Sequence, residues 1–164
     1  MTATSPPPED QDHLVVRSAT IDDVARIVEL IDLGSLTGPR EDRSDLADYE
    51  LALADILDTP GCEVLVVEHR GRVVGTTQLI TFRHLQMRGG RCAEIESMHV
   101  EPGLRSLGIG GVLLEAAVER AVALGCYRVQ LTSNKARVDA HRFYARHGFV
   151  ASHEGFKRVL EPDR

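Results

Sequence analysis

The sequence predicts an α+β fold in which a central mixed, mostly antiparallel, twisted sheet of about six or seven strands is flanked by about four helices. Three observations favour it. Short segments alternate apolar and polar residues, other segments carry apolar residues at helical spacing, and glycine or proline separates most of the two kinds. In chain order the elements are expected to follow β-α-α-β-β-β-α-β-α-β-β.

Composition bounds the kind of protein. The 164 residues are 43% hydrophobic and 27% charged, as in ordinary globular domains. A net charge of -6 argues against a nucleic-acid partner. No apolar run is long enough to span a membrane, and Met1–Asp12 lacks the features of a signal peptide, so we expect a cytoplasmic protein without a membrane partner. The three cysteines are widely spaced and read as buried thiols.

The N-terminal segment Met1–Asp12 contains three successive prolines and is expected to be a disordered tail, leaving residues 13–164 as a single domain. Leu14–Arg17 reads as a first strand. Thr20–Asp23 supplies capping side chains for a first helix, which Gly34 ends. Its apolar stripe comprises Val24, Ile27, Val28 and Ile31.

A polar stretch and a second helix follow. Ser35–Asp48 contains Gly, Pro and mixed charges and reads largely as loop. Asp45–Leu57 carries apolar residues along one side and is expected to be helical, with Pro60-Gly61 closing it.

Three strands come next. Glu63–His69 and Arg72–Thr81 form a hairpin across the two-residue turn Arg70-Gly71, whose glycine tolerates positive φ. Phe82–Arg91 is expected to be a polar loop, and Cys92–Val100 a further strand.

The last part of the chain alternates helices and strands. Gly125 and Gly148 stand where helix C-terminal caps belong. The expected elements are a helix over 110–124, a strand over Tyr127–Thr132, a helix over 136–147, and final strands at Val150–His153 and Phe156–Leu160.

The segment from Arg105 to Gly111 reads as an anion-binding loop. It joins the end of a strand to the start of a helix, where backbone N–H groups lack intrahelical partners and the helix dipole is positive. Gly108, Gly110 and Gly111 allow close approach of a phosphate, and Arg105 adds a charged donor. A Walker loop would end in Gly-Lys-Ser/Thr, and a dinucleotide fingerprint needs a third spaced glycine; neither is present.

Here the chain resembles the GCN5-related N-acetyltransferase (GNAT) superfamily. That family's signature Arg/Gln-x-x-Gly-x-Gly/Ala is matched by Arg105, Gly108 and Gly110, although many members have glycine where this chain has Ser106. The resemblance implies the GNAT fold and acetyl-CoA as co-substrate. It implies that pyrophosphate binds the amides of Arg105, Ser106, Leu107, Gly108, Ile109, Gly110 and Gly111. It also implies that pantetheine binds the backbone of Met98, His99 and Val100, together with Asn134.

Acyl transfer to an amine needs a proton acceptor and a proton donor. Glu94 and Glu96 are two residues apart on one strand and share a face of the sheet if no bulge intervenes. An exposed strand face is the alternative reading of this pair. The resemblance implies an acidic base on this strand; Glu94 fits slightly better than Glu96 because it opens the Glu-Ile stretch. Tyr144 alone could be a core aromatic. In the family, a tyrosine in Phe-Tyr-x-x-x-Gly-Phe commonly protonates the CoA thiolate.

Metal and cysteine chemistry are not expected. His141 and His147 are six residues apart, which does not place them on one helix face, so no metal site is predicted. Cys126 should lie in the core and has no neighbouring base in the sequence that would make it a nucleophile.

The acceptor is predicted to be a small-molecule primary amine. The first two helices, Ser35–Asp48 and Phe82–Arg91 are expected to build its pocket, with acids or arginines contributing charge. The run Thr132–Tyr144 and Phe156-Lys157 also resemble the bacterial aminoalkylphosphonate N-acetyltransferases. A protein or peptide N-acetyltransferase and a non-catalytic CoA-binding module are the alternatives. Dimerisation is common in this superfamily, so a homodimer stays open.

Overall fold

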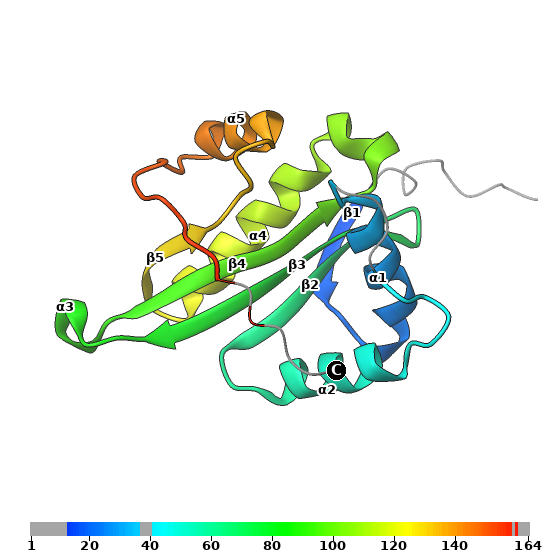
Figure 1. Ribbon diagram of the computed structural model, residues 1–164, viewed down its shortest axis with the longest axis horizontal. Helices are drawn as coiled ribbons and strands as arrows, with labels where there is room; N and C mark the ends of the chain where they lie inside the picture. Colours follow the sequence, from blue (N-terminus) through cyan, green and yellow to red (C-terminus); the bar gives the residue numbers. More distant parts are fainter. Residues whose placement is uncertain (1–12, 37–40, 159, 161–164) are drawn as a thin grey trace, which may run out of the picture.

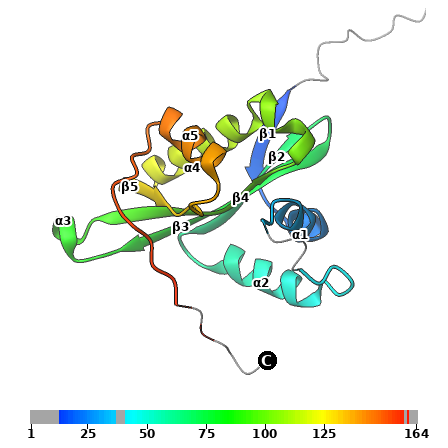
Figure 2. The same ribbon diagram turned by 45° about the horizontal axis from the view of Figure 1, so that its top comes forward.

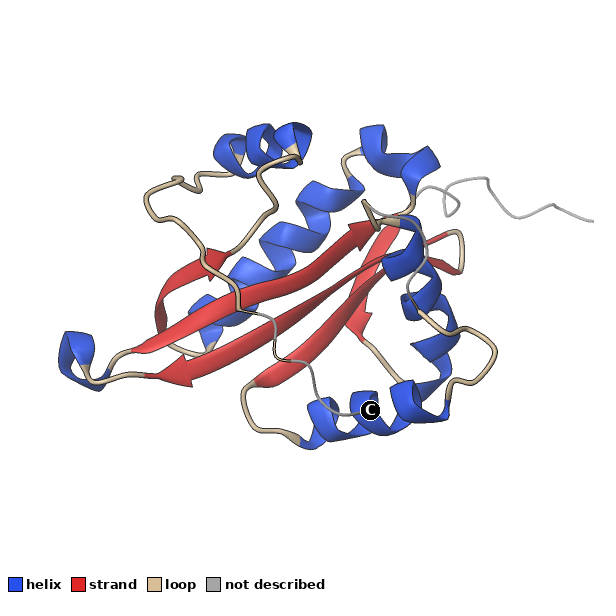
Figure 3. Cartoon of the chain, viewed as in Figure 1, coloured by secondary structure: helices blue, strands red, loops and turns tan. Residues whose placement is uncertain are grey.

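The computed structural model describes residues 13–36, 41–158 and 160, and the expected tail at Met1–Asp12 lies outside them. Five strands form one mixed sheet in the order β1-β2-β3-β4-β5 (Figures 1 and 3). Neighbouring strands are antiparallel except β4 and β5, which are parallel. The strands are β1 Leu14–Ser18, β2 Cys62–His69, β3 Arg72–Arg83, β4 Arg91–Val100 and β5 Cys126–Leu131.

Two layers of helix cover the sheet. α1 and α2 pack on one face, called here the α1/α2 face, and α4 packs on the other (Figures 1 and 2). The helices are α1 Val24–Leu33, α2 Ala47–Asp58, the short α3 Gln86–Gly89, α4 Ile109–Ala123 and α5 Val138–Arg146. Two short 3-10 helices, η1 Ile21–Asp23 and η2 Pro102–Leu107, precede α1 and α4.

Each face of the sheet has its own core. Leu65, Val67 and Leu79 point toward α4, where they pack on apolar residues of that helix such as Leu113. Val64 and Val66 belong to the opposite core, with α1 and α2. The strands therefore alternate between two apolar layers, because successive side chains of a strand point to opposite faces.

The predicted order of elements is confirmed as far as α5. The turn at Arg70-Gly71 has positive φ at both residues, as a two-residue hairpin requires. Phe82–Arg91 was expected to be loop throughout, and this is wrong at both ends. β3 runs on to Arg83, β4 begins at Arg91, and α3 lies at the tip of the hairpin between them.

The two expected C-terminal strands are wrong. Residues 149–158 contain no strand in the part of the chain that the structure describes, so the sheet has five strands instead of six or seven. The segment runs past β5 instead of alongside it (Figures 1 and 2). Val150 and Phe156, the first residues of the two expected strands, are 81% and 94% exposed. A strand needs a ladder of backbone hydrogen bonds to a neighbouring strand, and apolar residues alone do not supply one.

β4 contains a bulge at Ser97. Thr76 pairs with His99 and Gln78 with Glu96, so Ser97 and Met98 together oppose one residue of β3. Ser97 has φ +49, in the left-handed region. The bulge changes which side chains share a face, since one extra residue reverses the alternation beyond it.

An ion-pair network fixes the entry to α1. Arg17 on β1 bonds both carboxylate oxygens of Asp23 at 2.7 and 2.9 Å, and it also bonds Glu68 on β2. The Asp23 carboxylate accepts a hydrogen bond from the backbone N–H of Thr20 at 2.8 Å. Hydrogen bonds from Arg17 are the main cause that lowers the pKa of Asp23 below its ordinary value.

Replacing Asp23 with Ala is expected to lower the free energy of unfolding by about 2–3 kcal/mol, because a nearly buried charged hydrogen-bond partner is removed. Urea denaturation measures it. The pKa of Asp23 is lower in the folded protein, so its contribution is present above the ordinary aspartate pKa and lost as pH falls through the folded value. The exposed neighbour Asp22, replaced in the same way, should change stability by under about 0.5 kcal/mol; equal losses for both would contradict this role.

Candidate functional site

β5 ends opposite the middle of β4. Their parallel pairing runs from Arg91 opposite Cys126 to Ile95 opposite Leu131, and β5 ends at Leu131. β4 continues for five further residues to Val100, paired on its β3 side. On its other side, the backbone of 96–100 therefore has no partner in β5 within the described residues.

Two carboxylates lie on the α1/α2 face at this point. Glu94 pairs with Ile80 and Glu96 with Gln78, and both precede the bulge, so they share one face. Glu94 accepts a hydrogen bond from the Gln130 amide at 3.1 Å. Burial and then the neighbouring Glu94 raise the pKa of Glu96 above the ordinary glutamate value, while Lys157 acts in the opposite sense.

Tyr144 lies next to the part of β4 that extends beyond its pairing with β5. α5 places its hydroxyl 3.8 Å from the sulfur of Met98, and its ring contacts Phe149 edge-on. Burial, and to a smaller degree the charge of Glu96, raise the pKa of Tyr144 above the ordinary tyrosine value. The phenol thus stays protonated at neutral pH and can donate a proton.

His99 lies half-buried on the α1/α2 face of the sheet, beyond the bulge. A side chain at Gly34 would overlap its ring, so only glycine lets α1 end this close to β4. Arg137 donates to the carbonyl oxygen of Gly34 at 2.6 Å and thereby links the start of α5 to the end of α1. Burial, then Arg137 and Arg105, lower the pKa of His99 to about 4, so the imidazole is neutral at pH 7.

The glycine-containing loop leads from β4 into α4. Gly108 has φ +77 and precedes the first residue of the helix. A side chain there would meet nothing within 4 Å, so this turn is open. Arg105 is exposed, and its Nε donates to the carbonyl oxygen of Val100 at 3.3 Å. Ile109 is buried beneath the loop, Gly110 and Gly111 lie in the first helical turn, and Leu107 is exposed.

Asn134 holds the turn between β5 and α5. Its Oδ1 accepts from the backbone N–H of Ala136 at 2.9 Å, and its carbonyl oxygen accepts from that of Arg137 at the same distance. It is not the N-cap of α5, which is Arg137. Its exposed side chain is therefore already engaged with the local backbone.

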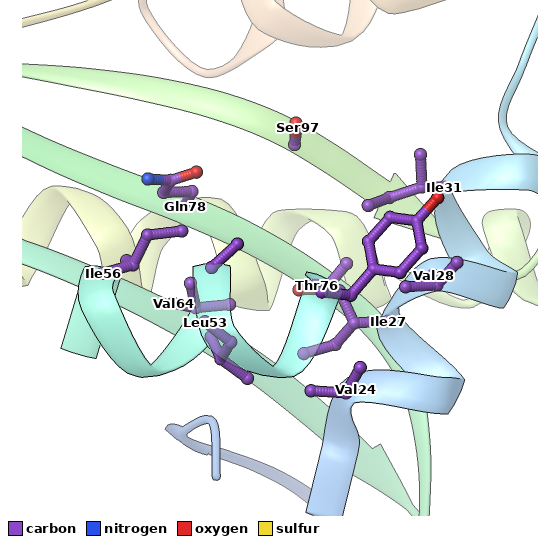
Figure 4. Close-up of a pocket in the computed structure, with 12 residues that line it drawn as sticks. Val24, Ile27, Val28, Ile31, Leu53, Ile56, Val64, Thr76, Gln78 and Ser97 are labelled. Atoms are coloured by element: carbon purple, nitrogen blue, oxygen red, sulfur yellow. The ribbon is translucent and has the colours of Figure 1, made fainter. Parts of the chain in front are cut away.

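A pocket of about 140 Å³ lies between α1, α2 and the sheet (Figure 4). The two helices contribute as expected, but neither Phe82–Arg91 nor a described residue of Ser35–Asp48 lines it, because the β3–β4 hairpin projects away from α1 and α2 (Figure 1). Gln78 and Ser97, labelled in Figure 4, form its edge next to Glu96 in the β3–β4 register.

Comparison with known proteins assigns the family. Residues 28–149 match the Acetyltransferase (GNAT) family, which is well over half of the chain. The chain belongs to the GNAT acetyltransferase family. It is therefore an acyltransferase, and enzymes of this family use acetyl-CoA as acyl donor.

Two curated relatives extend this GNAT assignment. An aminoalkylphosphonate N-acetyltransferase of Salmonella typhimurium is 36% identical over 65% of this chain and 68% of its own length. A glucosamine 6-phosphate N-acetyltransferase of Trypanosoma brucei brucei is 34% identical over 82% of this chain and 92% of its own.

Among solved structures, one described as a transcriptional regulator from Bacillus halodurans C-125 has a TM-score of 0.84 at 33% identity. The match covers 90% of this chain and 100% of the Bacillus halodurans chain. The GNAT fold was thus recognisable from the sequence, apart from the number of strands.

Three residues that shape the candidate site do not stand out in the sequence. Ser97 forms the bulge without the glycine that usually signals positive φ. Gly34 was read only as a helix end, whereas it makes room for His99. Arg137 joins α5 to α1 across 103 residues of chain, a contact that no local pattern reveals.

Within the described residues, no helix combines the length and apolar character needed to cross a bilayer. In the same residues, no three His, Cys, Asp or Glu side chains group closely enough to hold a metal ion.

Proposed function

We propose that this enzyme transfers the acetyl group of acetyl-CoA to the primary amine of a small molecule by direct attack within a ternary complex in the cytoplasm. The observation that carries the proposal is the placement of Glu96 and Tyr144. Glu96 is a carboxylate with a raised pKa, and Tyr144 is a protonated phenol. Both lie at the part of β4 that extends beyond its pairing with β5. An amine acetylation needs one group of each kind.

The donor would lie beside the part of β4 that extends beyond its pairing with β5. The backbone of Met98–Val100 would pair with the pantetheine arm as an added strand would. The amides from Arg105 to Gly111, with the Arg105 guanidinium, would bind the pyrophosphate at the helix start. The open turn at Gly108 supports this fit. Bound there, acetyl-CoA supplies the thioester carbonyl. Asn134 would need to give up its Ala136 contact to reach the pantetheine.

The residues then move two protons. Glu96 accepts a proton from the acceptor nitrogen as the N–C bond forms. Its raised pKa makes it a stronger base than an ordinary glutamate. Tyr144 donates its hydroxyl proton to the thioester sulfur of CoA as the C–S bond of the acetyl group breaks. Exchange with solvent returns both groups to their starting states. After burial, the neighbouring Glu94 is the next cause that raises the pKa of Glu96.

The proposal is tested by incubating the enzyme with acetyl-CoA and a panel of primary amines while free thiol is measured. Thiol release that depends on an amine, with the acetylated amine identified by mass spectrometry, is the expected result. Calorimetry with CoA alone separates binding from transfer. CoA binding without thiol release for any amine would favour the non-catalytic module, and acetylation of peptides alone would favour a protein N-acetyltransferase.

Replacing Lys157 with Met should move the acidic limb of the kcat/KM profile to higher pH. Lys157 lowers the pKa of Glu96, so its loss raises that pKa and the base becomes deprotonated only at higher pH. Activity measured from pH 4 to 9 with a fixed acceptor gives the shift. Lys135 is a matched control, because it pairs with Glu154. If the acidic limb does not move, or if Lys135→Met moves it equally, then Lys157 does not set the pKa of the base.

A further inference from the structure

The pocket between α1, α2 and the sheet has a polar end and a larger apolar end. Four of its twelve lining residues come from α1, four from α2 and four from the sheet. Those from α1 are all aliphatic, and Leu53 and Ile56 of α2 face them across the pocket (Figure 4). Among the described residues that line it, none carries a charge.

The polar end lies beside the proposed base. Gln78 pairs directly with Glu96, and Ser97 is the next residue of β4. These two side chains, with Thr76, supply the polar groups that the sheet contributes to the lining. An amine held near Glu96 would therefore have its substituent directed away from Gln78 and Ser97, toward the aliphatic side chains of the two helices.

Arg26 on α1 and Arg43 in the described part of the following loop are both already engaged. Arg26 bonds Glu29, Glu101 and the carbonyl oxygen of Val73. Arg43 pairs with Glu29 at 3.3 Å. Neither lines the pocket. None of the described residues that line the pocket would give a phosphate or phosphonate there a counter-charge, and burying an unpaired charge is strongly unfavourable.

The size of the pocket limits what it can hold. In a different protein, an apolar cavity of about 150 Å³ binds benzene. The pocket here, at about 140 Å³, is of that size and is open on one side. It would accommodate a phenyl ring or a chain of roughly four to six carbons.

We infer that the acceptor is a primary amine whose substituent is a compact, uncharged apolar group bound between α1 and α2. This rests on the proposed function and narrows its acceptor. It sets this chain apart from its two curated relatives, whose named acceptors carry a phosphonate or a phosphate.

The test compares kcat/KM for straight-chain amines from methylamine to octylamine, benzylamine, 2-aminoethylphosphonate and glucosamine 6-phosphate. Each added methylene should raise kcat/KM by about fourfold until the pocket is full, since burial of a methylene is favourable by that factor. Benzylamine should exceed 2-aminoethylphosphonate by at least about 100-fold. Higher kcat/KM for 2-aminoethylphosphonate or for glucosamine 6-phosphate than for butylamine would overturn the inference.

A pair of variants locates the effect. Ala52 and Ala54 are both exposed residues of α2, but only Ala52 lines the pocket. Ala52→Leu should lower kcat/KM for benzylamine by about tenfold or more and leave methylamine nearly unchanged, because the added side chain reduces the space in the pocket. Ala54→Leu, the matched control, should leave both unchanged. Equal effects of Ala52→Leu on both amines would contradict binding in this pocket.

Calorimetry without acetyl-CoA distinguishes the two proposals. The amines are titrated into wild type and Ala52→Leu. Apolar amines that bind wild type more tightly than the variant, yet are never acetylated, would overturn the proposed function and support this pocket as their site. Acetylation restricted to amines that carry a phosphonate or a phosphate would overturn the inference about an apolar acceptor. The proposed acetyltransferase function would still stand.

Discussion

Replacing Glu96 with Gln is expected to lower kcat by about 10²–10⁴-fold, which is the usual contribution of a positioned general base. Glutamine keeps the size and hydrogen bonding of the side chain but cannot accept the amine proton. The affinity for CoA should be unchanged, because the proposed donor contacts are made by the backbone beyond Ser97 and by the glycine loop. Steady-state kinetics at saturating acetyl-CoA and calorimetry with CoA measure the two quantities.

Glu94→Gln is the informative comparison. Glu94 raises the pKa of Glu96, so its neutralisation should lower that pKa and move the acidic limb of the rate profile to lower pH. The loss of kcat near pH 8 should be much smaller than for Glu96→Gln. A larger loss in the Glu94 variant would assign the base to Glu94, the residue that the sequence alone slightly favours.

Replacing Tyr144 with Phe is expected to lower kcat by at least about 100-fold while leaving CoA affinity nearly intact. The variant loses only the hydroxyl that lies 3.8 Å from the Met98 sulfur and keeps the ring packing against Phe149. The raised pKa of Tyr144 places loss of the acid above pH 10, so wild-type activity should not fall through deprotonation of this group in the neutral range.

Tyr127→Phe provides the control for that variant. Tyr127 shares a hydrogen bond with His84 at 2.8 Å, near the β3–β4 hairpin and outside the proposed site. Its turnover should match wild type. If Tyr144→Phe also retained full turnover, the proton donor would have to be another group, and Tyr144 would be left with a packing role.

The sequence predicts most of the fold because the elements up to α5 have strong periodicity and clear boundaries. α1 carries four apolar residues at helical spacing, and the hairpin turn at Arg70-Gly71 has the residues that such turns need. The C-terminal strands failed for a physical reason. Apolar residues such as Val150 and Phe156 are compatible with a strand, but strand formation also needs the edge of a neighbouring strand, which local sequence does not reveal.

The candidate site was predictable only in its local parts. Glu94 and Glu96 share a face because they are two apart on one strand, which sequence can show. The pocket could not be predicted, since its lining comes from α1, α2 and three strands and depends on how these pack. The described pocket has no charged lining residue and includes no described residue of the Ser35–Asp48 and Phe82–Arg91 segments, whose charges the sequence places near the acceptor.

The bulge at Ser97 makes the length of β4 matter more than the residue at that position. With the extra residue, His99 lies on the face of Thr76, and Val100 lies with Val67 in the opposite core. A deletion of Ser97 would reverse this arrangement for every residue that follows, directing the imidazole into the apolar layer and the valine out of it. Natural variation in this strand should therefore proceed by substitution at Ser97, while insertions and deletions there are eliminated.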